Sequence, residues 1–239
     1  MRGGSGLARH VRAGRRRHRG ASGVLLLAAS CLVPSSSSSQ QPPRHGRLFP
    51  PEQLGVLEGP DRDAWQRPGR IMDALGIADG STVADVGAGG GWFSIRLARR
   101  VGPNGMVFAE DVQREMIDAI ERRVRREGLR NVRPVLGRDD DPGLPEGRLD
   151  AVLMVDAYYE VQDRVSLLRR IRAALKPNGR VGIVDFRKDG GGPGPPLEQR
   201  IDPEVVIRDA TGAGLRLIAH ETFLPYQYLL VFGPEPLSP

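Results

Sequence analysis

The stretch Val83–Phe93, VADVGAGGGWF, limits the folds open to this chain more than any other segment. An apolar run leads into four glycines, and apolar residues at helical spacing follow them. The glycines therefore lie where a strand is expected to pass into a helix. Glycine lets backbone approach a ligand closely, and the N–H groups at a helix start face outward toward it. A plain tight turn remains the alternative, although one or two glycines would be enough to make it.

Around this stretch, the chain alternates apolar runs of strand length with segments of helical periodicity. Such alternation predicts an α/β fold with a parallel, doubly wound sheet. The last two strands have no helix between them, so we expect them to pair antiparallel. The predicted fold is a Rossmann-like, mixed seven-stranded sheet with an antiparallel C-terminal strand, flanked by helices. The expected strands are residues 82–87, 105–111, 131–137, 149–157, 180–187, 215–223 and 227–233.

Several local signals set expected element ends. Pro68 interrupts the leading helix over 59–77, and Asp202 is placed to cap the helix that Pro203 begins. Asn178 stands at an expected left-handed turn before the fifth strand. The segment 188–199, KDGGGPGPPLEQ, is expected to be a flexible loop.

Charge is distributed unevenly along the chain. The first 50 residues hold nine arginines and no acidic residue, which leaves 26 basic against 29 acidic residues in the remainder. The net charge of +6 therefore comes from the leader, and the remainder is slightly acidic. This balance argues against nucleic acid as a partner of the folded part.

The leader has the pattern of an export signal. A basic segment, RAGRRRHRG, precedes the short apolar run ASGVLLLAAS and the chain's single cysteine, Cys31. The arrangement resembles a bacterial lipoprotein signal, in which Cys31 would carry the lipid. The alternatives are another secretory signal, a mitochondrial transit peptide or a misassigned start codon. We expect a signal or leader over residues 1–31, a disordered Ser/Pro/Gln-rich tether over 32–47 and one domain over 48–239. The expected location is the periplasm or a membrane anchor if the leader is a signal, and otherwise the cytoplasm.

The register of the glycines separates two kinds of nucleotide loop. A dinucleotide fingerprint, G-x-G-x-x-G, starting at Gly87 needs its third glycine at the position of Trp92. What stands here is Asp85-x-Gly87-x-Gly89-x-Gly91. This pattern resembles motif I of the class I S-adenosylmethionine (SAM) dependent methyltransferases. The resemblance extends over about residues 62–233 and includes LKPNGRVGIVDF, which is similar to the turn and fifth strand of that family.

The resemblance implies SAM as the cofactor and assigns residues to it. Asp111, at the end of the second strand, would accept hydrogen bonds from the ribose hydroxyls. The alternative is that Asp111 is simply a solvated acid at the end of a strand. Asp140, five residues before Pro145, would meet the adenine amino group; its neighbour Asp141 and a merely solvated acidic loop are the alternatives. The implied cofactor-binding residues are Asp85, Gly87, Ala88, Gly89, Gly91, Asp111, Val112 and Asp140.

Candidate catalytic residues follow the fourth strand. Asp156 and Tyr159 stand in Asp156-Ala157-Tyr158-Tyr159, which is similar to the D-P-P-Y motif of amino-group methyltransferases but lacks both prolines. The tyrosines pack beneath the leading helix in the alternative interpretation. The leading helix covers the cofactor or acceptor site in relatives, so the resemblance implies that its Trp65 and Gln66 lie over that site. We expect no metal site, because the four histidines lack ligand spacing, and we expect His220 on an edge strand.

The sequence therefore predicts a SAM-dependent methyltransferase that acts on a small molecule. One alternative is a membrane-tethered, non-catalytic SAM-binding protein, because an exported enzyme has no evident SAM supply. Another is an NAD-type oxidoreductase, which the register at Trp92 disfavours. The sequence leaves the acceptor and the oligomeric state open.

Overall fold

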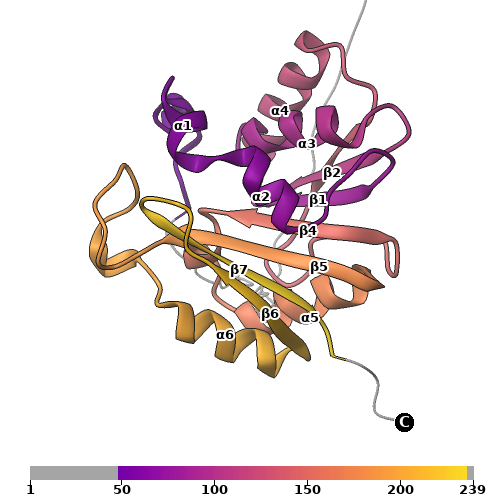
Figure 1. The fold of residues 1–239 in the computed structure, drawn as a ribbon. Helices are drawn as coiled ribbons and strands as arrows, with labels where there is room; N and C mark the ends of the chain where they lie inside the picture. The colour runs from indigo at the N-terminus through magenta and orange to yellow at the C-terminus, as the bar shows by residue number, and fades with distance from the viewer. Residues whose placement is uncertain (1–47, 236–239) are drawn as a thin grey trace, which may run out of the picture. The chain divides into compact units, whose positions relative to one another are not determined.

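The computed structural model describes residues 48–235, and these contain a single seven-stranded sheet (Figure 1). The strand order is β3-β2-β1-β4-β5-β7-β6. The first five strands pair in parallel, and β7 lies antiparallel between β5 and β6. The prediction of a mixed Rossmann-like sheet with antiparallel C-terminal strands is confirmed. The strands are β1 (Thr82–Val86), β2 (Met106–Asp111), β3 (Val132–Leu136), β4 (Leu149–Val155), β5 (Leu175–Phe186), β6 (Leu215–Glu221) and β7 (Gln227–Pro234).

Helices cover both faces of the sheet (Figure 1). On one face lie α2, α3 and α4, and on the other lie α5 and α6, as right-handed crossovers on either side of β1 require. The helices are α1 (Arg62–Gln66), α2 (Pro68–Ala74), α3 (Trp92–Val101), α4 (Arg114–Arg126), α5 (Arg164–Ala174) and α6 (Pro203–Gly212). Short 3-10 turns form η1 (Pro51–Glu58), η2 (Tyr158–Glu160) and η3 (Leu197–Gln199).

The central strands supply both cores, because successive side chains of a strand point to opposite faces. In β4, Val152 and Met154 pack with α5 and α6, whereas Leu153 and Val155 pack with α2 and α3. All four side chains are buried, as the nearly continuous apolar run of this strand predicts. The carboxyl ends of β1, β2, β4 and β5 are thereby fixed side by side at one edge of the sheet.

Pro68 breaks the expected leading helix into two. Arg67, with φ of +48°, ends α1 and precedes α2, which begins at Pro68. Proline has no N–H and disfavours helical backbone in the residue before it, so one continuous helix is excluded. The interruption predicted at Pro68 is therefore present, and it turns α1 toward the carboxyl edge of the sheet.

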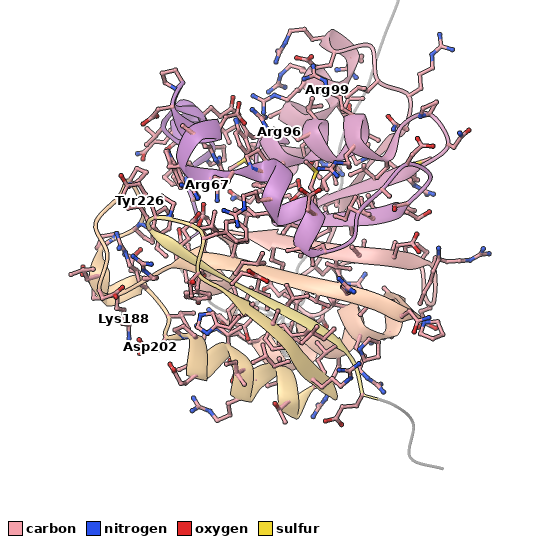
Figure 2. All side chains as sticks on the ribbon, viewed as in Figure 1. Arg67, Arg96, Arg99, Lys188, Asp202 and Tyr226 are labelled. Atoms are coloured by element: carbon pink, nitrogen blue, oxygen red, sulfur yellow. The ribbon has the colours of Figure 1, made fainter. Side chains whose placement is uncertain are left out.

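Two expected element ends are wrong in detail. Asn178 does not have a positive φ, because β5 already begins at Leu175, and the chain bulges over residues 176–179 where the register with β4 shifts. Asp202 stands at the N-cap position of α6, but its carboxylate makes no capping bond. It accepts a hydrogen bond from Lys188 Nζ at 2.7 Å instead, and the two side chains lie close together in Figure 2.

No helix among residues 48–235 is both long and apolar enough to cross a bilayer. His220 lies on β6, the edge strand of the sheet, as expected, and is exposed. Cys31 and the expected tether lie outside the described residues.

Candidate active site

A cavity of about 660 Å³ lies at the carboxyl ends of the central strands. Ligands of doubly wound sheets bind at this edge, and pockets of roughly 300–1,000 Å³ hold small molecules. The cavity runs from the glycine loop and the end of β2, past the end of β4, to the segments that follow β5 and precede β7. We call the part near the glycine loop the donor half and the part beyond Asp156 the acceptor half.

The glycine loop folds tightly against the turn after β4. Gly87 has φ of +69°, and a Cβ built on it would lie 2.5 Å from the Ala157 Cβ. Any side chain at position 87 would therefore push the end of β1 away from the end of β4. The Gly87 N–H donates to Glu110 Oε2 at 3.3 Å, and the Ala88 N–H donates to the Glu110 carbonyl at 2.8 Å. The loop is fastened to β2 before any ligand binds.

Asp111 fixes the two backbone segments that border the donor half. Its Oδ2 accepts the Gly89 N–H and its Oδ1 accepts the Gln113 N–H, each at 2.9 Å. The residue is 6% exposed and lines the cavity, as does Val112. A carboxylate oxygen accepts more than one hydrogen bond, so both oxygens retain acceptor capacity toward the cavity.

Asp85 connects β1 to the helix that follows the loop. Its Oδ2 accepts a hydrogen bond from Ser94 Oγ at 2.6 Å, and it is buried at the cavity wall. Next to it, Trp92 begins α3, with the guanidinium carbons of Arg62 and Arg96 lying 4.2 and 3.4 Å from its ring centroid. Trp92 therefore both packs and lines the cavity.

The acidic loop after β3 differs from the prediction. Asp140 is exposed, lies outside the cavity and pairs with Arg138 at 3.6 Å, so the expected adenine contact does not fit its position. Asp139 lines the cavity, and its Oδ1 is buried. Asp141 accepts from the Gly143 N–H at 2.9 Å and also pairs with Arg138. The five-residue spacing to Pro145 selects the wrong neighbour because the loop turns at Arg138, which bridges to Asp141.

Asp156 belongs to a closed ring of four polar side chains. Arg62 Nε donates to Gln66 Oε1 at 2.8 Å, and Gln66 Nε2 donates to Gln227 Oε1 at 2.7 Å. Gln227 Nε2 then donates to Asp156 Oδ1, and Arg62 Nη2 lies 3.7 Å from Asp156 Oδ2. The ring joins α1 and the ends of β4 and β7. The sequence predicted Asp156 as a site residue and Gln66 only as part of the covering helix. It gave no indication of Arg62 or Gln227.

The backbone and the charge of Asp156 both set it apart. Its φ of +56° is left-handed, which aspartate adopts more readily than most residues but which only Arg67 shares among the described non-glycine residues. Burial raises the pKa of Asp156 to about 6, against the opposing effect of Arg62. Strain and a raised pKa at a cavity wall are typical of functional residues.

The two neighbouring tyrosines have different surroundings. Tyr158 is fully buried, donates from its hydroxyl to Asp209 Oδ2 at 3.1 Å and does not line the cavity. Tyr159 lines the cavity and is half-buried. Burial raises the pKa of Tyr159, so its phenol keeps its proton at neutral pH.

Residues 48–58 cross the donor half, a covering segment that the sequence did not predict. The Phe49 N–H donates to Glu160 Oε2, and the Phe49 carbonyl accepts from Gln113 Nε2, each at 3.1 Å. Glu58 pairs with Arg123 of α4. The segment thus connects η2 to α4 over the glycine loop.

Arg200 holds the Gly/Pro-rich loop that was expected to be flexible. Its Nη1 donates to the carbonyls of Arg187 (2.9 Å), Gly190 (2.6 Å) and Gly191 (3.2 Å), and its Nε donates to that of Pro195 (2.9 Å). The side chain is buried. One guanidinium therefore binds four carbonyls of the loop and fixes its path along the cavity.

Arg200→Met is expected to destabilise the protein by about 1–3 kcal/mol, because it removes four charge-assisted hydrogen bonds to partly buried carbonyls. Urea unfolding measures the loss, and limited proteolysis should show new cleavage within 188–199. Arg208→Met, on the exposed side of α6, is the matched control and should leave both measurements unchanged. Equal stability of the two variants would show that Arg200 does not hold the loop.

Two buried carboxyls should make the stability of the ligand-free protein depend on pH. Burial raises the pKa of Asp85 and of Asp156 to about 6 in the folded state, whereas both remain near 3.8 when unfolded. The stabilisation from the folded protonated forms is present below the unfolded pKa and is lost as pH rises through 6. The free energy of unfolding should therefore fall by about 1–3 kcal/mol between pH 5.0 and 7.5.

Urea unfolding at the two pH values checks this expectation. The asparagine of Asp85→Asn cannot ionise. This variant should therefore lose the part of the pH dependence of the unfolding free energy that Asp85 contributes. A free energy of unfolding that rises toward pH 7.5 would contradict the assignment.

Comparison with known proteins agrees with this geometry. Residues 83–179 match the family model described as "Methyltransferase domain". A solved SAM-dependent methyltransferase from Aquifex aeolicus superposes with a TM-score of 0.74 at 28% identity, covering 77% of this chain and 98% of that chain. Over these residues the chain is similar to the SAM-dependent methyltransferases. Its glycine loop, β4 and β5 up to Gly179 lie within the matched residues.

Curated relatives of the methyltransferase domain match over shorter lengths. Nocamycin O-methyltransferase from Saccharothrix syringae is 32% identical over 131 residues, which is 55% of this chain and 44% of the relative. The ubiquinone/menaquinone biosynthesis C-methyltransferase of Pasteurella multocida is 32% identical over 130 residues, covering 52% and 46%. The chain thus spans about half the length of the curated relatives it matches.

Proposed function

We propose that the protein transfers a methyl group from SAM to a small-molecule acceptor. One observation carries the proposal: a single cavity joins the glycine loop and Asp111 to Asp156 without an intervening wall. A methyl donor in one half and an acceptor in the other would meet at the end of β4. Methyl transfer is an in-line displacement, for which positioning supplies much of the rate.

The residues of the donor half fit SAM. Asp111, with acceptor capacity on both oxygens, would take the ribose hydroxyls. The backbone of Gly87–Gly91, together with Ala88 and Asp85, would surround the positively charged methionine part. Asp139 replaces Asp140 as the acid placed to accept from the adenine amino group. Acidic groups at this wall suit a ligand that carries a sulfonium and an ammonium.

The chemistry divides between the ligand and two side chains. When bound, SAM supplies a methyl group on sulfur, which forms a bond to the acceptor's electron pair as the sulfur–carbon bond breaks and S-adenosylhomocysteine leaves. Asp156, ionised above pH 6, would take the proton that the acceptor loses. Tyr159, which keeps its proton at neutral pH and is hydrogen-bonded to Glu160, would stack on the acceptor.

The relatives support a small acceptor. The names of both curated relatives refer to low-molecular-weight compounds, nocamycin and ubiquinone or menaquinone. The folded part is slightly acidic, which disfavours nucleic acid.

Calorimetric titration of the purified full-length protein tests the proposal. We expect SAM and S-adenosylhomocysteine to bind and NAD not to bind. Failure of SAM to bind would refute the proposal, and binding of NAD in its place would favour an oxidoreductase. Binding of SAM with no transfer to any acceptor would favour the non-catalytic alternative.

For the leader, we propose lipidation of Cys31 and export or membrane anchoring. The support is the order of basic segment, short apolar run and cysteine. Mass spectrometry of the mature N-terminus tests it, with a diacylglyceryl modification on Cys31 as the expected result. An unprocessed N-terminus would refute it.

A further inference from the structure

Aromatic side chains concentrate in the cavity. The chain has only 12 Phe, Trp and Tyr residues, and seven of them line this one cavity. Three of the seven, Trp92, Phe93 and Phe186, are also buried in the core, whereas the other four are only half-buried. The seven are Phe49, Trp65, Trp92, Phe93, Tyr159, Phe186 and Tyr226.

Three of these rings form a connected wall in the acceptor half. The Trp65 ring centroid lies 5.9 Å from that of Phe186 and 6.1 Å from that of Tyr226, with interplanar angles of 46° and 60°. The residues come from α1, the end of β5 and the turn before β7. Tyr226 lies at the same end of the sheet as α1 (Figure 2). Trp65 and Tyr226 are only half-buried, so ring surface remains open to the cavity.

The loop after β5 closes this wall from behind. A Cβ built on Gly192 would lie 2.5 Å from Tyr226 Cγ, and one built on Gly194 would lie 2.5 Å from Phe186 Cδ2. The loop backbone therefore lies against both rings, at a distance that only glycine permits. Arg200, which fixes the loop, also lies 5.1 Å from the Phe186 ring centroid. The loop and Arg200 therefore hold the aromatic wall in place through contacts within the protein itself.

The loop adds apolar surface and no charge. The loop residues that line the cavity are Pro193, Gly194, Pro195, Pro196 and Gln199. Aromatic and proline surfaces favour flat apolar ligands, because ring pairs gain about 0.5–1.5 kcal/mol beyond their buried area. The acceptor half therefore has one aromatic wall that the prolines of the loop continue, and we call the space in front of this wall the slot.

Asp156 supplies the polar end of the slot. Its Oδ1 accepts from Gln227 and its Oδ2 faces Arg62, so the negative charge is already compensated. A compensated carboxylate has little need of a cationic ligand, and Arg62, already engaged by Asp156 and Gln66, does not call for an anionic one. It can accept a hydrogen bond from a neutral hydroxyl.

We propose that the methyl acceptor is a neutral aromatic hydroxyl compound whose ring lies in the slot formed by Trp65, Phe186 and Tyr226. The inference rests on the proposed methyltransferase function and names its substrate class. The hydroxyl faces Asp156, which takes the O–H proton while the oxygen electron pair forms the bond to the methyl carbon and the sulfur retains the pair of the broken bond. A flat ring is selected by the slot, and a hydroxyl by Asp156.

Two probes of equal size test the inference on the full-length protein saturated with S-adenosylhomocysteine. The probes are 2-naphthol and decahydro-2-naphthol, which share the hydroxyl and differ in the aromatic ring. Calorimetry should show 2-naphthol binding at least about fivefold tighter, as ring–ring contacts require. Cyclohexylamine, a cation without a ring system, should bind more weakly than 2-naphthol.

Variants locate the binding to the slot. Trp65→Leu and Tyr226→Leu should each weaken 2-naphthol binding about threefold to tenfold, whereas Tyr226→Phe should retain it. Phe223→Leu is the matched control, because Phe223 lies outside the cavity and packs under Arg70. Unchanged S-adenosylhomocysteine affinity in each variant verifies folding, and if one leucine variant does not fold, the other decides.

The outcomes separate the two proposals. Binding of S-adenosylhomocysteine without preference for 2-naphthol, or with a preference for cyclohexylamine, overturns the slot and leaves the methyltransferase proposal intact. Selective binding of 2-naphthol without binding of S-adenosylhomocysteine supports the slot and refutes the methyltransferase proposal. A preference for 2-naphthol that survives both leucine substitutions also overturns the slot.

Discussion

Asp156→Asn is expected to slow methyl transfer by about two orders of magnitude or more, the usual contribution of a positioned general base. Asparagine tolerates the positive φ at this position and still accepts from Gln227, so the backbone and one contact of the ring are kept. What is lost is the ability to take a proton. The measurement is single-turnover formation of S-adenosylhomocysteine from SAM, with 2-naphthol as the acceptor.

The same substitution should change S-adenosylhomocysteine affinity by less than about twofold, since Asp156 lies beyond the donor half. Asp150→Asn is the control, because Asp150 lies near the amino end of the same strand, where it binds Thr82 and Lys176. It should leave the rate unchanged. A rate for Asp156→Asn close to that of the unaltered protein would show that the acceptor's proton leaves by another route.

Asp111→Ala is expected to weaken S-adenosylhomocysteine binding by about 1–3 kcal/mol, roughly fivefold to 150-fold. The carboxylate would bind the ribose, and it also holds the Gly89 and Gln113 N–H groups in place. Its removal therefore affects both the ligand and the two backbone segments around it. Calorimetric titration measures the change directly.

Asp140→Ala is the matched control, because Asp140 is an exposed acid that lies outside the cavity. It should bind S-adenosylhomocysteine as the unaltered protein does. The pair of variants thus also tests the correction made in the acidic loop. Equal affinity of the Asp111 and Asp140 variants would refute the ribose contact, and a large loss in Asp140→Ala would restore the original assignment.

The fold could be predicted because it depends on repeated local patterns. Apolar runs of strand length, separated by helical periodicity, leave few arrangements other than a doubly wound sheet. The antiparallel end followed from the missing helix before Gln227. Asn178 and Asp202 were interpreted incorrectly because each residue type has a preferred role that tertiary contacts overrode: a strand that begins early, and an ion pair with Lys188.

The donor half could be predicted better than the acceptor half. The glycine loop and Asp111 are close in sequence to the strands that position them, so spacing indicates their place. Asp139 was missed because a one-residue choice depends on the turn at Arg138. Arg62, Phe186 and Gln227 come together only through the pairing of β5 with β7 and the turn at Arg67. No local pattern reports contacts between such distant segments.

The hydrogen-bonded ring of Arg62, Gln66, Gln227 and Asp156 constrains any redesign of the acceptor half. α1 carries both Trp65 and two members of this hydrogen-bonded ring. The indole proposed to meet the acceptor and the carboxyl proposed to take its proton are therefore mechanically coupled. A substitution that reshapes the slot by moving α1 will also change the distance from Arg62 to Asp156, and with it the acidity of that carboxyl. Acceptor choice and working pH are therefore inherited together, and a redesign of one must readjust the other.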